Sequence, residues 1–283
     1  MKVLVTGANG QLGRCLKDAG SKYEAIEFIY AESNVLNICN LEEVSTFFKT
    51  NKNIKYCINC AAYTAVDKAE TDKDKAYEVN AVGAKNLAIA CNENNAVLIH
   101  ISTDFVFDGT QTEAYKETDK TNPLSVYGKT KLKGETEIAN IFNTYFILRT
   151  SWLYSEYGNN FMKTMLRLSE TRDEISVVSD QVGTPTYAGD LAEGIVNIIN
   201  QKITTFGMYH YSNEGVASWF DFAKEIFDLS EKAIKVFPIK TEAYPTPAKR
   251  PEFSVMDKSK IKNNLKLEIP YWKTSLKKAI DKL

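Results

Sequence analysis

The fold is decided by the first thirteen residues, where positions 2–13 read Lys2-Val3-Leu4-Val5-Thr6-Gly7-Ala8-Asn9-Gly10-Gln11-Leu12-Gly13. The apolar run up to Thr6 predicts a strand, and residues 11–19 predict a helix. In such a turn the first glycine allows a sharp bend, the second lets the backbone approach a pyrophosphate, and the third permits close packing of helix on strand. The phosphates then sit at the positive end of the helix. The stretch therefore predicts a dinucleotide-binding βαβ unit.

The same alternation of apolar runs and amphipathic stretches continues through the first two thirds of the chain, which is typical of a parallel sheet. Strands are expected at 2–6, 27–31, 54–61, 96–102 and 145–150, and helices at 11–19, 41–49, 74–92, 126–140, 188–200 and 219–227, the last with Ser218 as N-cap. The predicted class is α/β, a Rossmann-type doubly wound parallel sheet with a smaller C-terminal domain. We expect a dinucleotide-binding domain over 1–150 and mainly a substrate-binding domain over 151–283, with some segments of the second returning to the first.

Composition excludes several classes of protein. The formal net charge is -1, without a basic run that would attract nucleic acid. No apolar stretch reaches the ~18 residues of a membrane span, and the N-terminus lacks the layout of a signal peptide. Two histidines and five scattered cysteines favour neither a metal centre nor a disulfide framework. Cys57 and Cys60 lie three apart in a strand, so their thiols should face opposite sides of the sheet. We expect a cytoplasmic protein that binds neither nucleic acid nor membrane.

An acidic residue after the second strand bears on the choice of cofactor. Glu32 lies 19 positions beyond Gly13, close to the ~20 at which such folds place the acid that binds the adenosine ribose. A carboxylate there repels a 2′-phosphate, which favours NADH over NADPH, with NADPH still possible. The alternatives are that Glu32 is an ordinary surface residue, or that Glu27 is the acid.

A candidate catalytic pair lies in the predicted helix 126–140. Tyr127 and Lys131 are four residues apart and so share one helix face. A nearby ammonium lowers the pKa of a phenol, which can then exchange a proton with a carbonyl or an alcohol. The preceding strand ends in Ser102-Thr103-Asp104, and the carboxyl end of a parallel strand faces the ligand crevice. Thr103 could therefore bind the same substrate oxygen as Tyr127.

These features together resemble the extended short-chain dehydrogenases/reductases, and more narrowly the dTDP-4-dehydrorhamnose reductase family. Six blocks in order carry the narrower resemblance, which spans nearly the whole chain: 61–70 (AAYTAVDKAE), 102–109 (STDFVFDG), 149–154 (RTSWLY), 158–161 (GNNF), 180–186 (DQVGTPT) and 249–251 (KRP).

The resemblance implies an NAD(P)H-dependent reduction of the 4-keto group of dTDP-4-dehydro-6-deoxy-L-mannose to dTDP-L-rhamnose. Tyr127 would donate the proton, Lys131 would hold the nicotinamide ribose and lower the tyrosine pKa, and Thr103 would orient the keto oxygen. The expected cofactor-binding residues, besides Tyr127 and Lys131, are Gly7, Gly10, Gln11, Leu12, Gly13, Glu32, Asn37, Ile38, Ala61, Ala62 and Tyr63. The expected substrate-binding residues are Thr103, Asp104, Trp152, Asn160 and Arg250, the last for the diphosphate because a guanidinium matches phosphate geometry.

Three departures from the family pattern stand out. Phe105 replaces a frequent tyrosine, which removes one hydroxyl, and Asn37 stands where an aspartate usually lies near the adenine. Some members are thought to dimerise through magnesium held by C-terminal carboxylates, but residues 272–283 contain four basic residues and one acid, Asp281. We expect no metal site, a solvated lysine-rich terminal helix, and a monomer or homodimer.

Two other functions fit the same fold. A nucleotide-sugar 4,6-dehydratase would need a glutamate directly after Asp104, where this chain has Phe105; a 4-epimerase belongs to the same group of alternatives. A non-catalytic regulatory subunit, as in methionine adenosyltransferase, could retain the fold, but the intact set of Thr103, Tyr127 and Lys131 argues against it.

Overall fold

Six parallel strands form the central sheet of the protein, whose computed structural model describes residues 1–283. The strand order is β10-β5-β4-β3-β1-β2, with every neighbouring pair parallel. The bounds are β1 Lys2–Thr6, β2 Glu27–Ala31, β3 Ile54–Asn59, β4 Val97–Thr103, β5 Tyr145–Thr150 and β10 Gly207–His210. The predicted class is confirmed, and the strand order reverses next to β1, where such folds bind their ligands.

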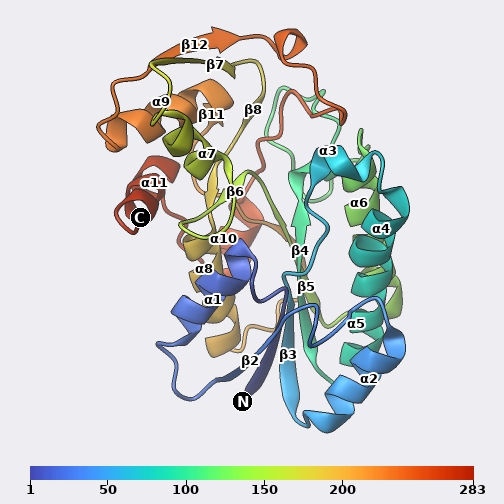
Figure 1. Ribbon diagram of the computed structural model, residues 1–283. Helices are drawn as coiled ribbons and strands as arrows, with labels where there is room; N and C mark the ends of the chain where they lie inside the picture. Colours follow the sequence, from blue (N-terminus) through green and yellow to red (C-terminus); the bar gives the residue numbers. More distant parts are fainter.

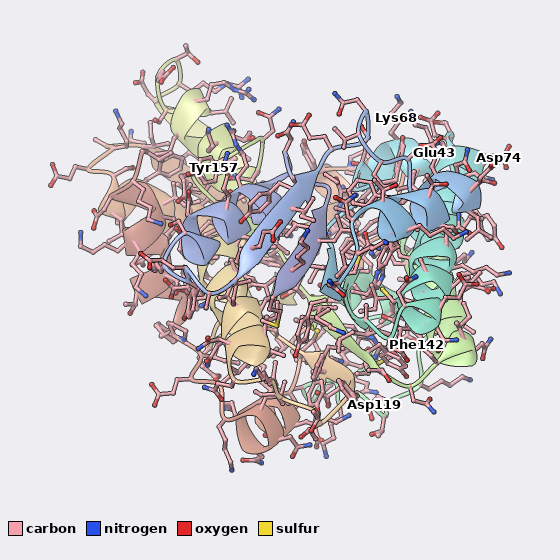
Figure 2. The ribbon with its side chains drawn as sticks, turned by 90° about the horizontal axis from the view of Figure 1, so that it is seen from below. Glu43, Lys68, Asp74, Asp119, Phe142 and Tyr157 are labelled. Atoms are coloured by element: carbon pink, nitrogen blue, oxygen red, sulfur yellow. The ribbon has the colours of Figure 1, made fainter.

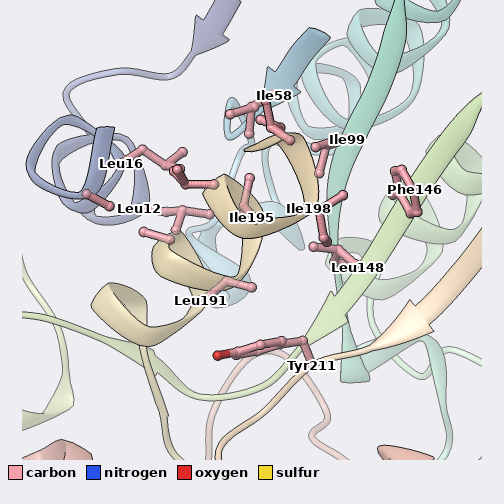
Figure 3. Packing of buried hydrophobic residues seen from close by; sticks show 14 of the residues in the cluster. Leu12, Leu16, Ile58, Ile99, Phe146, Leu148, Leu191, Ile195, Ile198 and Tyr211 are labelled. Atoms are coloured by element: carbon pink, nitrogen blue, oxygen red, sulfur yellow. The ribbon is translucent and has the colours of Figure 1, made fainter. Parts of the chain in front are cut away.

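Helices cover both faces of the sheet (Figure 1). On one face lie α1 Gln11–Gly20, α8 Ala188–Asn200 and α10 Ser259–Leu265, and on the other lie α2 Leu41–Thr50, α5 Gly83–Glu93 and α6 Val126–Ile141. Figure 3 shows the first face, where Leu12 and Leu16 of α1 and Leu191, Ile195 and Ile198 of α8 pack onto Ile58, Ile99 and Leu148 of the sheet. Burial on both faces explains why the strands are nearly continuous apolar runs.

One predicted helix contains an irregularity. The pattern over 74–92 predicts one regular helix, but the structure has α4 Lys73–Tyr77, a π-helical turn Glu78–Val82 and then α5. Within this turn the buried Asn80 side chain accepts from the backbone N–H of Tyr63 and donates to Thr130 of α6. The wide turn therefore carries an amide that joins the loop after β3 to α6, and hydrophobic periodicity gives no sign of it.

A smaller lobe lies over the carboxyl ends of the sheet strands (Figure 1). It has its own core, in which Tyr154, Phe222 and Trp272 are buried. Its elements are β6 Leu153–Tyr154, α7 Phe161–Leu168, β7 Glu174–Val178, β8 Val182–Gly183, β9 Thr186–Tyr187, β11 Ala217–Ser218, α9 Trp219–Leu229, β12 Lys235–Ile239 and α11 Trp272–Ile280. Elsewhere in the chain, short turns of α- or 3-10 helix lie at Val66–Ala69 (α3), Asp104–Val106 and Thr241–Ala243. Ser218 caps α9 as predicted, in a capping box with Asp221.

The chain crosses between the lobe and the sheet more than once. After residue 150, α8 packs on α1, and β10 pairs with β5. The terminal helix corrects one expectation: Lys278 and Lys282 do not simply face solvent, because they pair with the buried carboxylates of Asp190 and Glu156. The first pair joins α11 to α8, and the second joins the residue two positions beyond α11 to the loop that follows β6.

The cysteines lie as predicted. Cys57 belongs to the core on the α5 side of the sheet, and Cys60 packs against the core on the α1 side. All five thiols are free.

A buried ion pair attaches α6 to the sheet. Arg149 of β5 donates from Nε and Nη2 to the two carboxylate oxygens of Glu135, at 2.9 and 2.7 Å, and both side chains are 3% exposed. Ser102 of β4 donates to the same carboxylate. Three elements thus meet at one carboxylate, one helical turn beyond Lys131.

We predict that Arg149→Met lowers the free energy of unfolding by about 3–5 kcal/mol, because it leaves the Glu135 carboxylate buried without its cation. The double variant Glu135→Leu/Arg149→Met should lose clearly less than the sum of the two single variants. Urea denaturation of all three proteins measures this coupling. Strictly additive losses would mean that the two residues do not act as a pair.

Candidate active site

The glycine loop joins β1 to α1 with very close backbone contacts. Gly7 has φ +65°, a conformation that favours glycine, and a Cβ there would lie 2.7 Å from Ala61 N. A Cβ on Gly13 would lie 2.6 Å from the carbonyl oxygens of Gly7 and Ala8. The turn and the close packing predicted from the spacing are both present.

The start of α1 suits an anion. Its N-cap is the exposed Gly10, which offers no side-chain acceptor, and the first turn contains no acid. The amides around Gln11 and Leu12 are therefore open to a phosphate at the positive end of the helix. Residues of the smaller lobe border this loop: Ser155 and Asn160 both donate to Gln11 Oε1, and Tyr157 donates to Asp18 of α1. Figure 2 shows Tyr157 beside this helix.

Candidate residues for the adenosine end follow β2. Glu32 comes directly after Ala31, which pairs with Thr6 at the carboxyl end of β1. Glu27 starts β2 at the opposite edge and pairs with Lys2, so position excludes it as the rival acid. Near Glu32 in the chain, the Asn37 side chain accepts from Cys39 N, and Ile38 packs against Gly83.

The loop Ala61–Tyr63 runs from the glycine loop toward α6. Asn59 at the end of β3 accepts from Ala61 N, and Asn80 pairs with both backbone polar groups of Tyr63. The Tyr63 hydroxyl donates to Asp72 at 2.8 Å. Ala62 lies between these two anchored residues, so the whole segment is fixed.

Tyr127, Thr103 and Lys131 come together at the carboxyl end of β4. Ser125 caps α6, and a Cβ on Gly128 would lie 2.3 Å from the Phe105 carbonyl oxygen, so only glycine lets the helix approach this closely. The Tyr127 ring then meets Phe105 edge to face, with centroids 5.6 Å apart. Lys131 reaches back to β4, where its Nζ donates to the Ile101 carbonyl at 2.5 Å.

Burial sets the protonation of this group. Although Tyr127 keeps some exposure, the protein atoms around its hydroxyl raise its pKa to about 12, and the Thr103 hydroxyl partly offsets this rise. Burial also lowers the pKa of Lys131 to about 8. The expectation that the Lys131 ammonium lowers the tyrosine pKa does not hold in this arrangement, because Nζ is directed toward Ile101. At neutral pH the phenol is protonated and able to donate.

Asp104 is a buried carboxyl beside this group. It accepts from Thr103 at 3.1 Å, its Oδ2 has no hydrogen-bond partner, and the side chain is 1% exposed. Burial raises its pKa to about 6, against the opposing effect of the Ser254 and Thr103 hydroxyls.

Trp152 is held in a strained conformation by its neighbours. Its φ is +45°, which is unusual for a bulky residue and typical of functional sites. The indole stacks on Trp219 with centroids 3.6 Å apart, and a Cβ on Gly183 would lie 2.8 Å from its ring. The flat ring is therefore fixed from two sides.

The two remaining candidates have other partners in this structure. Asn160 caps α7 and holds Gln11, which places it beside the glycine loop. Both terminal nitrogens of Arg250 donate to the Asp67 carboxylate, which joins the segment 246–250 to α3.

Four residues of this region were not predicted from the sequence: Asn59, Asn80, His100 and Trp219. Asn59 and His100 are 1% exposed; Asn59 ends the mostly apolar β3, and His100 interrupts the apolar run of β4. Because a buried polar group needs a partner, such interruptions are the signal that could have identified them. No group of three or more metal-binding side chains is present, and none of the helices is long and apolar enough to span a membrane.

Comparison with known proteins gives concordant results. A family model described as "RmlD substrate binding domain" matches residues 1–283. The chain is 42% identical to a dTDP-4-dehydrorhamnose reductase of Aggregatibacter actinomycetemcomitans, over 98% of this chain and 97% of that protein. It is similar to the crystal structure of such a reductase from Clostridium acetobutylicum (TM-score 0.95, 47% identity, 99% of both chains). It is also similar to the Bacillus anthracis reductase in complex with NADP (TM-score 0.94, 41% identity, 100% and 99% of the two chains).

We predict that Asp104→Asn changes how stability depends on pH. Because the folded protein holds the Asp104 proton more tightly than the unfolded chain does, this group stabilises the wild type fully below about pH 4. That contribution is lost as pH rises through about 6. Relative to the variant, the wild type should lose on the order of 3 kcal/mol between pH 4 and 7. Urea denaturation across this range measures it, and a difference between the two proteins that is constant with pH would contradict the assignment.

Proposed function

The chain belongs to the family of the RmlD substrate binding domain, in which its close relatives are dTDP-4-dehydrorhamnose reductases, and we propose that it reduces dTDP-4-dehydro-6-deoxy-L-mannose to dTDP-L-rhamnose with a reduced nicotinamide cofactor. One observation carries the proposal: Thr103, Tyr127 and Lys131 meet at the carboxyl edge of the sheet on which the glycine loop opens.

The cofactor, when bound, supplies the hydride that reduces the keto carbon. The protein supplies the proton, which Tyr127 donates to the C4 oxygen of the sugar. The raised pKa keeps the phenol protonated until that oxygen becomes basic enough to take the proton. Thr103, the last residue of β4, orients the same oxygen. Lys131 holds the ribose next to the nicotinamide.

The cofactor would be held by residues whose backbones come close together. Gly7, Gly10, Gln11, Leu12 and Gly13 would surround the pyrophosphate, which the uncapped start of α1 favours. The segment Ala61–Tyr63 would line the path toward the nicotinamide, and Glu32 with Asn37 and Ile38 would surround the adenosine.

The smaller lobe would bind the nucleotide sugar. The fixed face of Trp152 suits a 6-deoxy sugar, whose methyl group gains from leaving water. Asp104 and Asn160 would contact polar groups of the substrate. Arg250 would bind the diphosphate, either by leaving the Asp67 carboxylate for it or by donating to both. We accordingly divide the chain into a cofactor-binding domain (1–150) and a substrate-binding domain (151–283), from which α8 and β10 return to the sheet.

The function is tested by mixing the purified protein with NADH and dTDP-4-dehydro-6-deoxy-L-mannose. We expect oxidation of NADH and, by NMR of the product, the dTDP-L-rhamnose configuration at C4. Tyr127→Phe, which lacks only the donor hydroxyl, should bind NADH normally and lose at least ~100-fold in turnover. A 6-deoxy-L-talose product would overturn the stereochemistry, and near-full turnover of Tyr127→Phe would overturn the mechanism.

We further propose that the cofactor is preferentially NADH, because the Glu32 carboxylate would accept from the ribose hydroxyls and repel a 2′-phosphate. The relative from B. anthracis is described with NADP, so the preference has to come from this chain's own residues.

Glu32→Ser should therefore relax the preference, mostly through tighter NADPH binding. Titrating both reduced cofactors against wild type and variant, with Glu27→Ser as the matched control at the other end of β2, measures this. Equal affinities of the wild type for NADH and NADPH would make Glu32 a surface residue.

A further inference from the structure

His100 is a buried imidazole to which the proposed reaction gives no role. It lies in β4 and is 1% exposed. Its Nδ1 is 3.0 Å from Asn59 Nδ2, and its Nε2 is 3.5 Å from Lys131 Nζ. The ring therefore connects an amide at the end of β3 to the proposed catalytic lysine.

The orientation of the Asn59 amide is fixed by its other contacts. Its Oδ1 accepts from the Thr6 hydroxyl at 2.8 Å and from the backbone N–H of Ala61 at 3.2 Å. A backbone N–H can only donate, so the atom that faces it must be the amide oxygen. The amide nitrogen of Asn59 consequently faces His100.

The Asn59 amide in turn fixes the tautomer of His100. Nδ1 receives the Asn59 N–H and so carries no proton of its own. Burial, together with the Lys131 cation, holds the pKa of His100 well below its usual range. The neutral ring then carries its single proton on Nε2, and this N–H points at Lys131 Nζ.

We propose that Asn59 and His100 form a tautomer lock that favours the neutral amine of Lys131 over its ammonium. An ammonium can only donate, so it meets the Nε2–H of His100 donor to donor, whereas a neutral amine accepts this hydrogen bond. The lock thus stabilises the form of Lys131 that remains after one Nζ–H bond breaks and water takes the proton. His100 is a positioning residue in this scheme, because it acts through Lys131.

The other groups around Lys131 do not replace this effect. The Ile101 carbonyl accepts from either form of the amine. Glu135 favours the ammonium, but its carboxylate is already shared by Arg149 and Ser102. Burial raises the pKa of the Cys60 thiol, so it remains neutral. Burial of Lys131 itself, which lowers its pKa to about 8, acts in the same direction as the lock.

The tautomer can be read directly, because the chain has only two histidines. Long-range 1H–15N NMR of the cofactor-free protein separates protonated from unprotonated ring nitrogens. His210 is an internal reference of opposite tautomer, since its Nδ1 lies 3.1 Å from the Tyr115 carbonyl oxygen and must carry the proton. We expect His100 protonated at Nε2 and His210 at Nδ1. Protonation of His100 at Nδ1 would overturn the proposal.

Asn59→Asp should invert the lock. The carboxylate still accepts from Thr6 and Ala61 but cannot donate to His100, so the ring proton moves to Nδ1 and Nε2 becomes an acceptor for the ammonium. The pKa of Lys131 should then rise by about one pH unit or more. NMR titration of the lysine side chains, with the Lys131 signal assigned by its absence in Lys131→Met, measures this.

His100→Asn provides a test without an added charge. Its amide oxygen can replace Nδ1 as acceptor for Asn59, while the donor that faces Lys131 is removed. The Lys131 pKa should rise here too, and His210→Asn, at the other histidine, should leave it unchanged. An unchanged Lys131 pKa in His100→Asn would overturn the proposal, whatever Asn59→Asp shows.

The importance of the lock for catalysis rests on the proposed function, but these readouts do not, because they use the protein without cofactor or substrate. Failure of the reductase assay would therefore overturn the function and leave the titration result standing.

Discussion

The ion pair between Glu135 and Arg149 is the contact on which the geometry of the site most depends. It ties α6 to β5, and through Ser102 to β4, at a point one helical turn from Lys131. At the other end of the same helix Gly128 meets the Phe105 carbonyl, and Ser125 caps the first turn. A helix fixed at two levels can neither slide nor rotate. The two proposed catalytic side chains therefore keep their position relative to Thr103 without contacting each other.

The lobe that covers the sheet is attached to it by polar side chains. Gln11 takes hydrogen bonds from Ser155 and Asn160, and Arg250 pairs with Asp67. These contacts border the loops that would hold the cofactor and the sugar. Polar contacts of this kind can exchange partners with a ligand more easily than an apolar interface can. We therefore expect binding of substrate or cofactor to change contacts in both the smaller lobe and the sheet domain.

Five of the six sheet strands could be predicted because the central ones are buried on both faces and their near-continuous apolar runs report this directly, whereas the short edge strand β10 was not predicted. The bounds of β1, β2, β5 and α8 are identical to the bounds predicted from the sequence. The π-helical turn at Asn80 and the strained φ of Trp152 could not be predicted, since each is imposed by contacts from distant segments: Tyr63 and Thr130 in one case, Trp219 and Gly183 in the other. The candidate residues around Thr103 lie together as expected, but their protonation depends on burial that local sequence does not encode.

Burial also explains why one small region can hold groups with opposite tasks. Removing a side chain from water disfavours its charged form, so the same desolvation raises the pKa values of Tyr127 and Asp104 and lowers that of Lys131. A phenol and an ammonium that have nearly equal proton affinities in water are thereby moved apart, because the pKa of Tyr127 rises to about 12 and that of Lys131 falls to about 8. The phenolate is therefore the stronger base of the two, so after Tyr127 gives its proton to the substrate it regains one more readily than Lys131 does. The hydrogen bonds of Asn59 and His100 extend this effect, because they add a directed donor to a lysine that burial alone has already made a weaker base.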